Sequence, residues 1–145
     1  MSMSTSSRAT LAIAGAGDRG AMDDEAAIMA VLEAETDAWL RRDFPAQAQY
    51  WVHSPQTRMM TAFASLGARV TEGWDAIGAR LERQMLRFAQ RYDMAERIRR
   101  ERVNIVVVGD LAWVSYDQIG SDAGDDSESS GVQRELKIFQ RIDGA

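Results

Sequence analysis

The sequence has no cysteine, a single histidine and a single lysine among its 145 residues. The absence of cysteine excludes disulfides, thiolate nucleophiles and cysteine-ligated metals, and one histidine is too few for a histidine-rich metal centre. No apolar run approaches the roughly 20 residues that span a membrane. We therefore expect no metal, no cofactor and no membrane partner, and a cytoplasmic protein.

Basic side chains are fewer than acidic ones, and the formal net charge is −5. An acidic total argues against a nucleic-acid binder, whose phosphate contacts need a basic face. Of the 17 basic residues, all are arginines except Lys137. The arginines that crowd between Arg80 and Arg102 are interleaved with acidic residues, which favours a solvated, ion-paired surface over a phosphate site.

The first 22 residues are rich in serine, glycine and alanine and offer little to bury. We predict a flexible leader over residues 1–22 and one domain over residues 23–145. The leader contains Gly15-Ala-Gly17-Asp-Arg-Gly20, which has the spacing of a dinucleotide-binding turn. Such a turn needs a buried strand before it, and residues 11–14 are too few and too small, so no nucleotide cofactor is predicted.

Hydrophobic periodicity predicts a mixed α and β domain. Helices are expected over residues 24–42, 45–51 and 73–92, and strands over 57–63, 68–71, 102–108, 111–119 and 132–142. After the last strand, Asp143-Gly144 is a hairpin turn signal with no strand following it. A final strand is therefore expected to be missing from the sheet.

The order of these elements resembles the nuclear transport factor 2-like (NTF2-like, or SnoaL-like) superfamily. The matching details are Arg42-Asp43-Phe44 at the end of the first helix, Tyr50-Trp51 before a strand that starts after a proline, and the strand opening 109–113. The resemblance implies an α+β fold with a curved antiparallel or mixed sheet wrapped as a cone around a long helix. It also implies a pocket covered by the N-terminal helices, and a homodimer formed through the sheet.

Glu35 is the first candidate catalytic residue, because it lies in the middle of the apolar stripe of the first helix. A buried carboxylate must be paired, hydrogen-bonded or protonated, and such a group serves as a general acid or base or holds a polar ligand. The alternative is a structural acid paired with an arginine. His53 is the second candidate, as a proton acceptor or ligand-orienting group, and its alternative is a half-buried histidine bonded to the backbone.

The resemblance also bears on one specific reaction. Steroid-isomerase-like members carry a catalytic carboxylate immediately before the proline and a tyrosine on the first helix. Here Ser54 and Glu35 occupy those positions. The isomerase mechanism is therefore disfavoured, although Glu35 and His53 remain a different candidate acid–base pair.

Aromatic and methionine side chains are expected to line the pocket, with the ordinary alternative that they form the core. In the strand over 111–119, alternation separates Trp113 from Tyr116, and the sequence does not indicate which face is concave. The candidate pocket residues are Trp39, Tyr50, Trp51, Ser54, Trp74, Met85, Phe88, Trp113 and Tyr116.

Three functions fit this pattern. The first is a domain that binds a small apolar or amphipathic molecule, as a sensory or accessory module. The second is a cofactor-independent isomerase, cyclase or dehydratase that uses Glu35 and His53, so whether the protein is an enzyme stays open. The third is an interaction module with a filled core, whose signature is a large exposed apolar patch.

Overall fold

The computed structural model describes residues 4–14, 21–63, 67–89, 91, 98–120 and 132–142. It is an α+β fold whose elements follow the order β1 (Ser4–Ala14), α1 (Ala21–Leu40), α2 (Phe44–Ala48), β2 (Arg58–Phe63), β3 (Gly67–Glu72), α3 (Trp74–Arg87), β4 (Ile98–Val108), β5 (Leu111–Gly120) and β6 (Val132–Ile142). From α1 onward these elements match the predicted ones in type and order. No helix among the described residues is long and apolar enough to cross a membrane.

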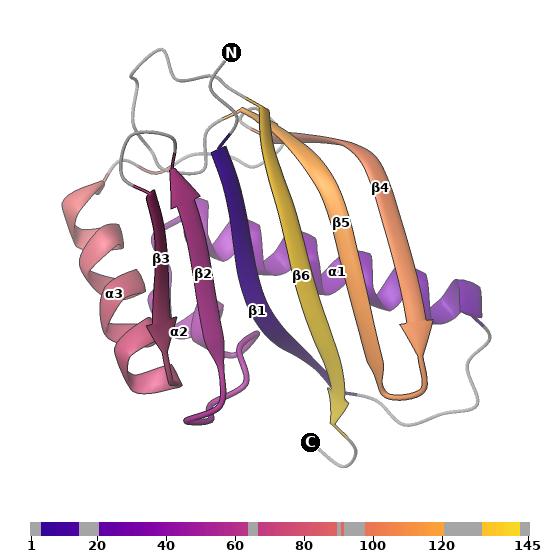
Figure 1. Cartoon of the computed structure of the whole chain (residues 1–145). Coiled ribbons are helices and arrows are strands. Elements are labelled where there is room, and N and C mark those ends of the chain that lie inside the picture. Colours follow the sequence, from indigo (N-terminus) through magenta and orange to yellow (C-terminus); the bar gives the residue numbers. More distant parts are fainter. Residues whose placement is uncertain are drawn as a thin grey trace.

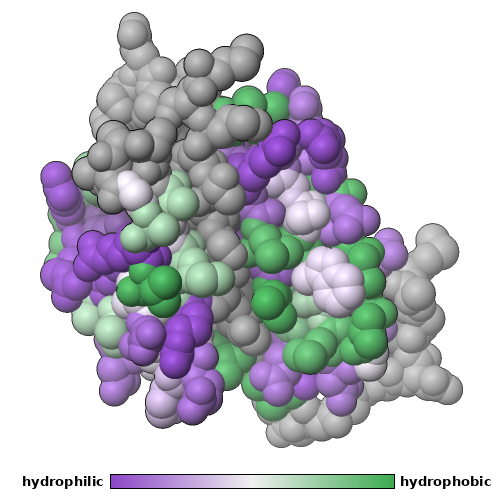
Figure 2. All heavy atoms as spheres, viewed as in Figure 1, coloured by the Kyte–Doolittle hydropathy of each residue, from purple (hydrophilic) through white to green (hydrophobic). Residues whose placement is uncertain are grey.

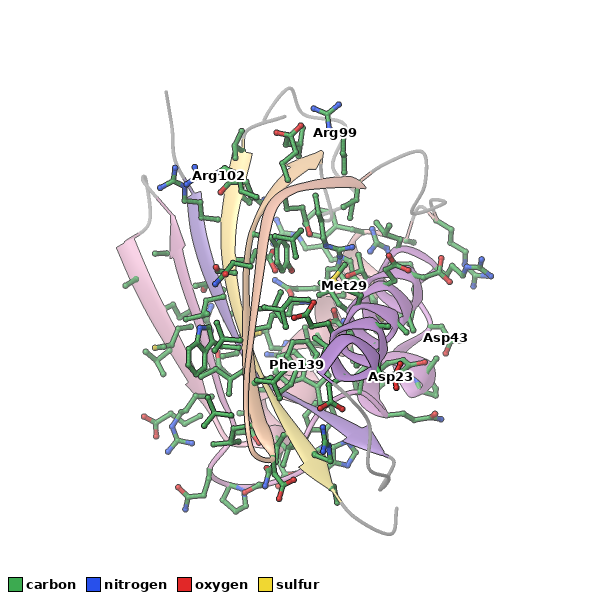
Figure 3. All side chains as sticks on the ribbon, turned by 90° about the vertical axis from the view of Figure 1, so that its right-hand side faces the viewer. Asp23, Met29, Asp43, Arg99, Arg102 and Phe139 are labelled. Atoms are coloured by element: carbon green, nitrogen blue, oxygen red, sulfur yellow. The ribbon has the colours of Figure 1, made fainter. Side chains whose placement is uncertain are left out.

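The strands form one six-stranded sheet in the order β3-β2-β1-β6-β5-β4. Neighbouring strands are antiparallel except β1 and β6, which are parallel. Helix α1 lies across one face of this sheet, which we call the inner face (Figures 1 and 3). Helix α3 packs against β2 and β3 at the other end of the sheet from β4.

The strand β1 corrects the expectation of a flexible leader over residues 1–22. Ser4–Ala14 pairs with β2 on one side and with β6 on the other. Its small and polar residues suggested disorder, but strand formation is decided by pairing with neighbours more than by composition. β6 is thus paired on both sides, by β5 and β1, and the missing final strand stays a prediction.

Short-range signals correctly indicated the break between α1 and α2 and the start of α2. The Asp43 side chain accepts a hydrogen bond from the backbone N–H of Ala46 at 3.0 Å, and Pro45 occupies the first turn of α2. This is the arrangement that caps the unpaired amides of a helix start. It fixes α2 directly after α1, so that Gln47 of α2 is fully buried.

Helix α3 contains one departure from its predicted pattern. Ile77, Leu81 and Met85 form an apolar row at helical spacing, and all three are buried. Arg80 was expected on the solvated side with the other arginines, but it is buried and donates hydrogen bonds to the hydroxyls of Thr71 and Thr61. It is three residues from Ile77, beside the apolar row, and the adjacent strands supply acceptors for its guanidinium.

The alternation of β6 is inverted relative to an ordinary amphipathic strand. The inner face of β6 carries Glu135, Lys137 and Phe139, all buried. The opposite face, which we call the outer face, carries exposed apolar side chains instead. Figure 2 shows them gathered over β4–β6: Val108, Leu111, Trp113, Leu136 and Ile138.

Candidate functional site

Glu35 lies at the centre of the buried side of α1, and its side chain has no exposed surface. Lys137 of β6 reaches it from the inner face, with Nζ 2.7 Å from Oε2. The amide of Gln47 donates to the other carboxylate oxygen, Oε1, at 3.0 Å. The prediction of a buried acid in the apolar stripe is confirmed, and its ion-pair partner is the only lysine of the chain.

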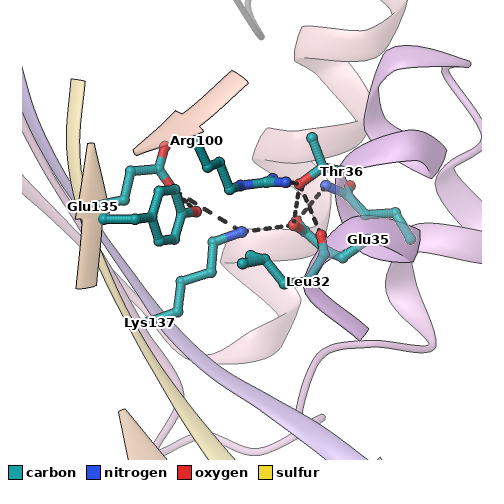
Figure 4. A network of polar contacts seen from close by, with 8 residues as sticks. Leu32, Glu35, Thr36, Arg100, Glu135 and Lys137 are labelled. Atoms are coloured by element: carbon teal, nitrogen blue, oxygen red, sulfur yellow. Dashed lines mark hydrogen bonds and ion pairs between the residues drawn. The ribbon is translucent and has the colours of Figure 1, made fainter. Parts of the chain in front are cut away.

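Two further groups continue this contact along the sheet. Lys137 Nζ lies 4.0 Å from Oε2 of Glu135, and that oxygen accepts a hydrogen bond of 2.7 Å from the hydroxyl of Tyr116. Tyr116 and Glu135 are register partners on β5 and β6, so their side chains leave the same face of the sheet side by side. Figure 4 shows this line of side chains between the strands and α1.

Arg100 closes the cluster from β4. Its Nη2 donates to the hydroxyl of Thr36 on α1 at 2.7 Å, and its guanidinium carbon lies 5.2 Å from the centroid of the Tyr116 ring. Thr36 in turn donates to the backbone carbonyl of Leu32 at 2.9 Å. We call the whole group the inner polar cluster: Glu35, Thr36, Gln47, Arg100, Tyr116, Gln118, Glu135 and Lys137.

This cluster is costly to bury. Each ion removed from water loses several kcal/mol of hydration, and an apolar replacement of a buried ion pair is often neutral or stabilising. Glu35, Glu135 and Lys137 are all nearly fully buried. A set of charges that fold stability does not require is a candidate for function.

Several polar atoms of the cluster have no hydrogen-bond partner among the described residues. They are Gln47 Oε1, Arg100 Nε, Gln118 Nε2 and Glu135 Oε1. Buried polar atoms of native proteins are nearly always partnered, and each exception needs a physical account. An oxygen-bearing molecule held at the inner face would give these donors and acceptors partners.

The Tyr116 hydroxyl is strongly perturbed by this setting. Burial, and then the Glu135 carboxylate, raise the pKa of Tyr116 well above its ordinary value of 10.0, while Arg100 lowers it by a smaller amount. At neutral pH the phenol is therefore a proton donor. The hydroxyl donates to Glu135 Oε2, so the other carboxylate oxygen, Oε1, has no hydrogen-bond partner in the described part of the chain.

The raised pKa of Tyr116 predicts a loss of stability in alkali. Because the pKa is higher in the folded state, the stabilisation is complete below about pH 10 and is lost as the pH rises through the folded-state pKa. We expect urea unfolding to show a steeper fall in stability above pH 10 for the wild type than for Tyr116→Phe. An identical pH dependence for the two proteins would contradict this account.

His53 lies outside the inner polar cluster. Its ring is exposed, stacks on Trp74 with 4.2 Å between ring centroids, and has Nε2 2.8 Å from the carbonyl oxygen of Ala48. A carbonyl only accepts, so this nitrogen carries the proton. Neither contact involves Glu35, so the structure does not join the two candidate catalytic residues directly. His53, Ser54 and Trp74 instead line an open surface groove beside the start of α3.

The predicted pocket residues do not gather in one pocket, and Ser54 and Trp74 lie in the groove just described. Trp39, Trp51 and Met85 are buried in the hydrophobic core, and Tyr50 packs against it, while Phe88 is half-buried just after α3. Only Tyr116 belongs to the inner polar cluster. Trp113 lies on the outer face, where it is 40% exposed. A cavity of about 20 Å³ lies between α1 and the β4–β5 turn and includes none of the predicted residues.

Sequence reasoning missed most of the cluster, namely Thr36, Gln47, Arg100, Gln118, Glu135 and Lys137. One signal was present, because a chain that uses arginine 16 times retains a lysine only at position 137. Arg100, Gln118 and Glu135 gave no local signal, since they become neighbours only through the pairing of β4, β5 and β6. Thr36 and Gln47 join them from helices α1 and α2.

Comparison with solved structures gives a likeness at the level of the fold. No protein-family model matches the sequence, and no curated protein matches it significantly. A solved structure, described as "a putative dehydratase from the NTF2-like family from Streptomyces avermitilis", matches with a TM-score of 0.51 and 15% identity. The match covers 85% of this chain and 99% of that one.

Proposed function

Since the chain has an NTF2-like fold, we propose that it binds a small molecule at the inner polar cluster. The observation that carries the proposal is the set of buried, unpartnered polar atoms on the inner face, at Arg100, Gln118 and Glu135. These three residues come from three adjacent strands. A ligand that pairs with these atoms recovers the hydration free energy that they lose on folding.

The proposal differs from the predicted apolar pocket in the chemistry of its walls. Charged and amide groups face α1 from β4, β5 and β6, so an amphipathic ligand fits better than a purely apolar one. Its polar end would contact the cluster. Its apolar part would lie against the neighbouring core residues Val114 and Phe139, which share the inner face.

A fragment-binding experiment tests this function. The ¹⁵N-labelled protein is titrated with neutral alcohols, ketones and amides, and the side-chain amide signals of Gln47 and Gln118 are followed by NMR. We expect several fragments to shift these two signals in the wild type and in Glu82→Gln, an exposed-carboxylate control. Fragments that shift only residues of the outer face or of the His53 groove would overturn the proposal.

Acid–base catalysis at the same place is the second candidate function. Tyr116, Glu135, Lys137 and Glu35 form a continuous line of proton donors and acceptors, with contacts of 2.7, 4.0 and 2.7 Å. The structural relative described as a dehydratase favours this type of chemistry. Glu35 keeps a candidate role, with Lys137 and Glu135 as its neighbours in place of His53.

We also propose that the outer face pairs with a second copy of the chain. The apolar side chains of β4–β6 form a groove whose lining contains no charged residue. Trp113 lies opposite Ile138, and Ser115 opposite Leu136, so the patch is continuous across β5 and β6. A continuous apolar face can pair with its own copy about a two-fold axis, as in the homodimer that the family resemblance implies.

A further inference from the structure

We infer that the ligand is a neutral hydroxy-carbonyl compound, held with its carbonyl on Arg100 Nε and its hydroxyl on Glu135 Oε1. This inference rests on the proposed binding function and specifies its ligand class. The two contact atoms flank the Tyr116 side chain: the guanidinium of Arg100 lies over the ring, and Glu135 accepts from the hydroxyl. Figure 4 shows Arg100 reaching Thr36 on α1, with Glu135 on the strand side of the cluster.

The neighbouring contacts leave these two atoms available. The guanidinium of Arg100 is held by the Thr36 hydroxyl and by the Tyr116 ring, and its Nε has no partner among the described residues. Glu135 contacts Tyr116 and Lys137 through Oε2, and its other oxygen, Oε1, has no hydrogen-bond partner among the described residues. Glu135 is only 3% exposed, so bulk water does not reach it freely.

The hydrogen-bonding polarity of these atoms fixes what the ligand must present. Arginine Nε only donates, and an ionised carboxylate only accepts. The ligand therefore offers one acceptor and one donor, as a carbonyl and a hydroxyl do. Gln118, the register partner of Arg100 on β5, adds an amide donor beside the carbonyl position.

The charge of the cluster selects a neutral ligand. Glu35 and Glu135 are balanced by Lys137 and Arg100, and Lys137 lies between the two carboxylates. An added carboxylate or ammonium would introduce a charge without a counter-ion in a buried site, which is strongly unfavourable. A neutral molecule leaves this balance intact.

Three matched probes test the ligand class by NMR titration of the Gln118 amide signal. They are 4-hydroxy-2-butanone, 2-butanone without the hydroxyl, and 3-hydroxybutyrate with a negative charge. A hydrogen bond to a charged group contributes enough for the hydroxyketone to bind at least about tenfold more tightly than either of the others. Equal binding of all three at Gln118 would overturn the ligand class and leave the proposed binding function standing.

Two variants assign the contacts. In Glu135→Gln the amide turns a donor toward the ligand, so the preference for the hydroxyketone over 2-butanone should fall to about twofold or less. In Arg100→Lys, which keeps the charge but removes Nε, both ketones should weaken together. Glu82→Gln is the control and should preserve the preference. No shift at Gln118 with any probe would show that these atoms bind no ligand of this class. A hydroxyl preference unchanged in Glu135→Gln would show that Glu135 does not hold the hydroxyl, and either result would overturn the inference.

Discussion

Lys137→Met is expected to lower the free energy of unfolding by about 3–5 kcal/mol at pH 7. The substitution removes the ammonium group that lies 2.7 Å from Glu35, whose side chain has no exposed surface. Gln47 and Thr36 still contact the carboxylate, but neutral groups do not replace an ammonium group at that distance. Urea unfolding of the variant and the wild type measures the loss.

The double variant Glu35→Leu/Lys137→Met provides the matched control. It removes both charges and keeps the volume approximately, so its stability should lie within about 1.5 kcal/mol of the wild type or above it. The single variant should also recover stability as the pH falls, because the Glu35 carboxyl can then be protonated. A cost below about 1 kcal/mol for Lys137→Met would show that the Glu35 carboxylate does not depend on Lys137. A double variant that loses as much as the single one would show that the fold needs the ion pair itself, which would contradict the expectation that both charges can be removed together.

Local patterns were sufficient for much of the fold. The spacing of Ile77, Leu81 and Met85 identified α3, and the Asp43-Phe44-Pro45 sequence identified the break between α1 and α2. The position of Glu35 within an apolar stripe correctly indicated burial. In each case the physical cause is a contact within a few residues of sequence, which periodicity and capping record.

Non-local pairing explains what the sequence did not show. β1 is a strand because β2 and β6 pair with it, and its own composition gives no such indication. Likewise, Glu35 and Lys137 are 102 positions apart, and only the sheet register brings them together. His53 was singled out for its chemistry, but its position is set by stacking on Trp74, in a surface groove.

The inverted alternation of β6 links the two faces of the sheet. Side chains alternate along a strand, so placing Glu135 and Lys137 on the inner face necessarily places Leu136 and Ile138 on the outer one. Hydrophobic patterning alone predicts the opposite arrangement, with the apolar residues on the inner face. The same register that builds a polar interior thus produces an exposed apolar face that a partner would cover.

Ile138→Lys is expected to abolish the dimer that we propose for this face. Ile138 is 43% exposed in this patch, opposite Trp113. In a two-fold interface the substitution places two unpaired ammonium groups near each other in an apolar contact, which costs about 3 kcal/mol or more, or about 100-fold in the dissociation constant. Sedimentation velocity over a concentration series measures this change.

Leu86→Lys is the matched control for the dimer. Leu86 is a large apolar residue, 76% exposed on α3, and lies outside the β4–β6 patch, so the same change in net charge there should leave the dissociation constant unaltered. Lysine is also favourable in the last turn of a helix, which keeps α3 intact. A wild-type protein that remains monomeric at about 100 μM, in the micromolar-to-millimolar range of weak association, would show that the outer face does not bind a second copy. Equal weakening by both substitutions would show that net charge, and not this patch, controls the association.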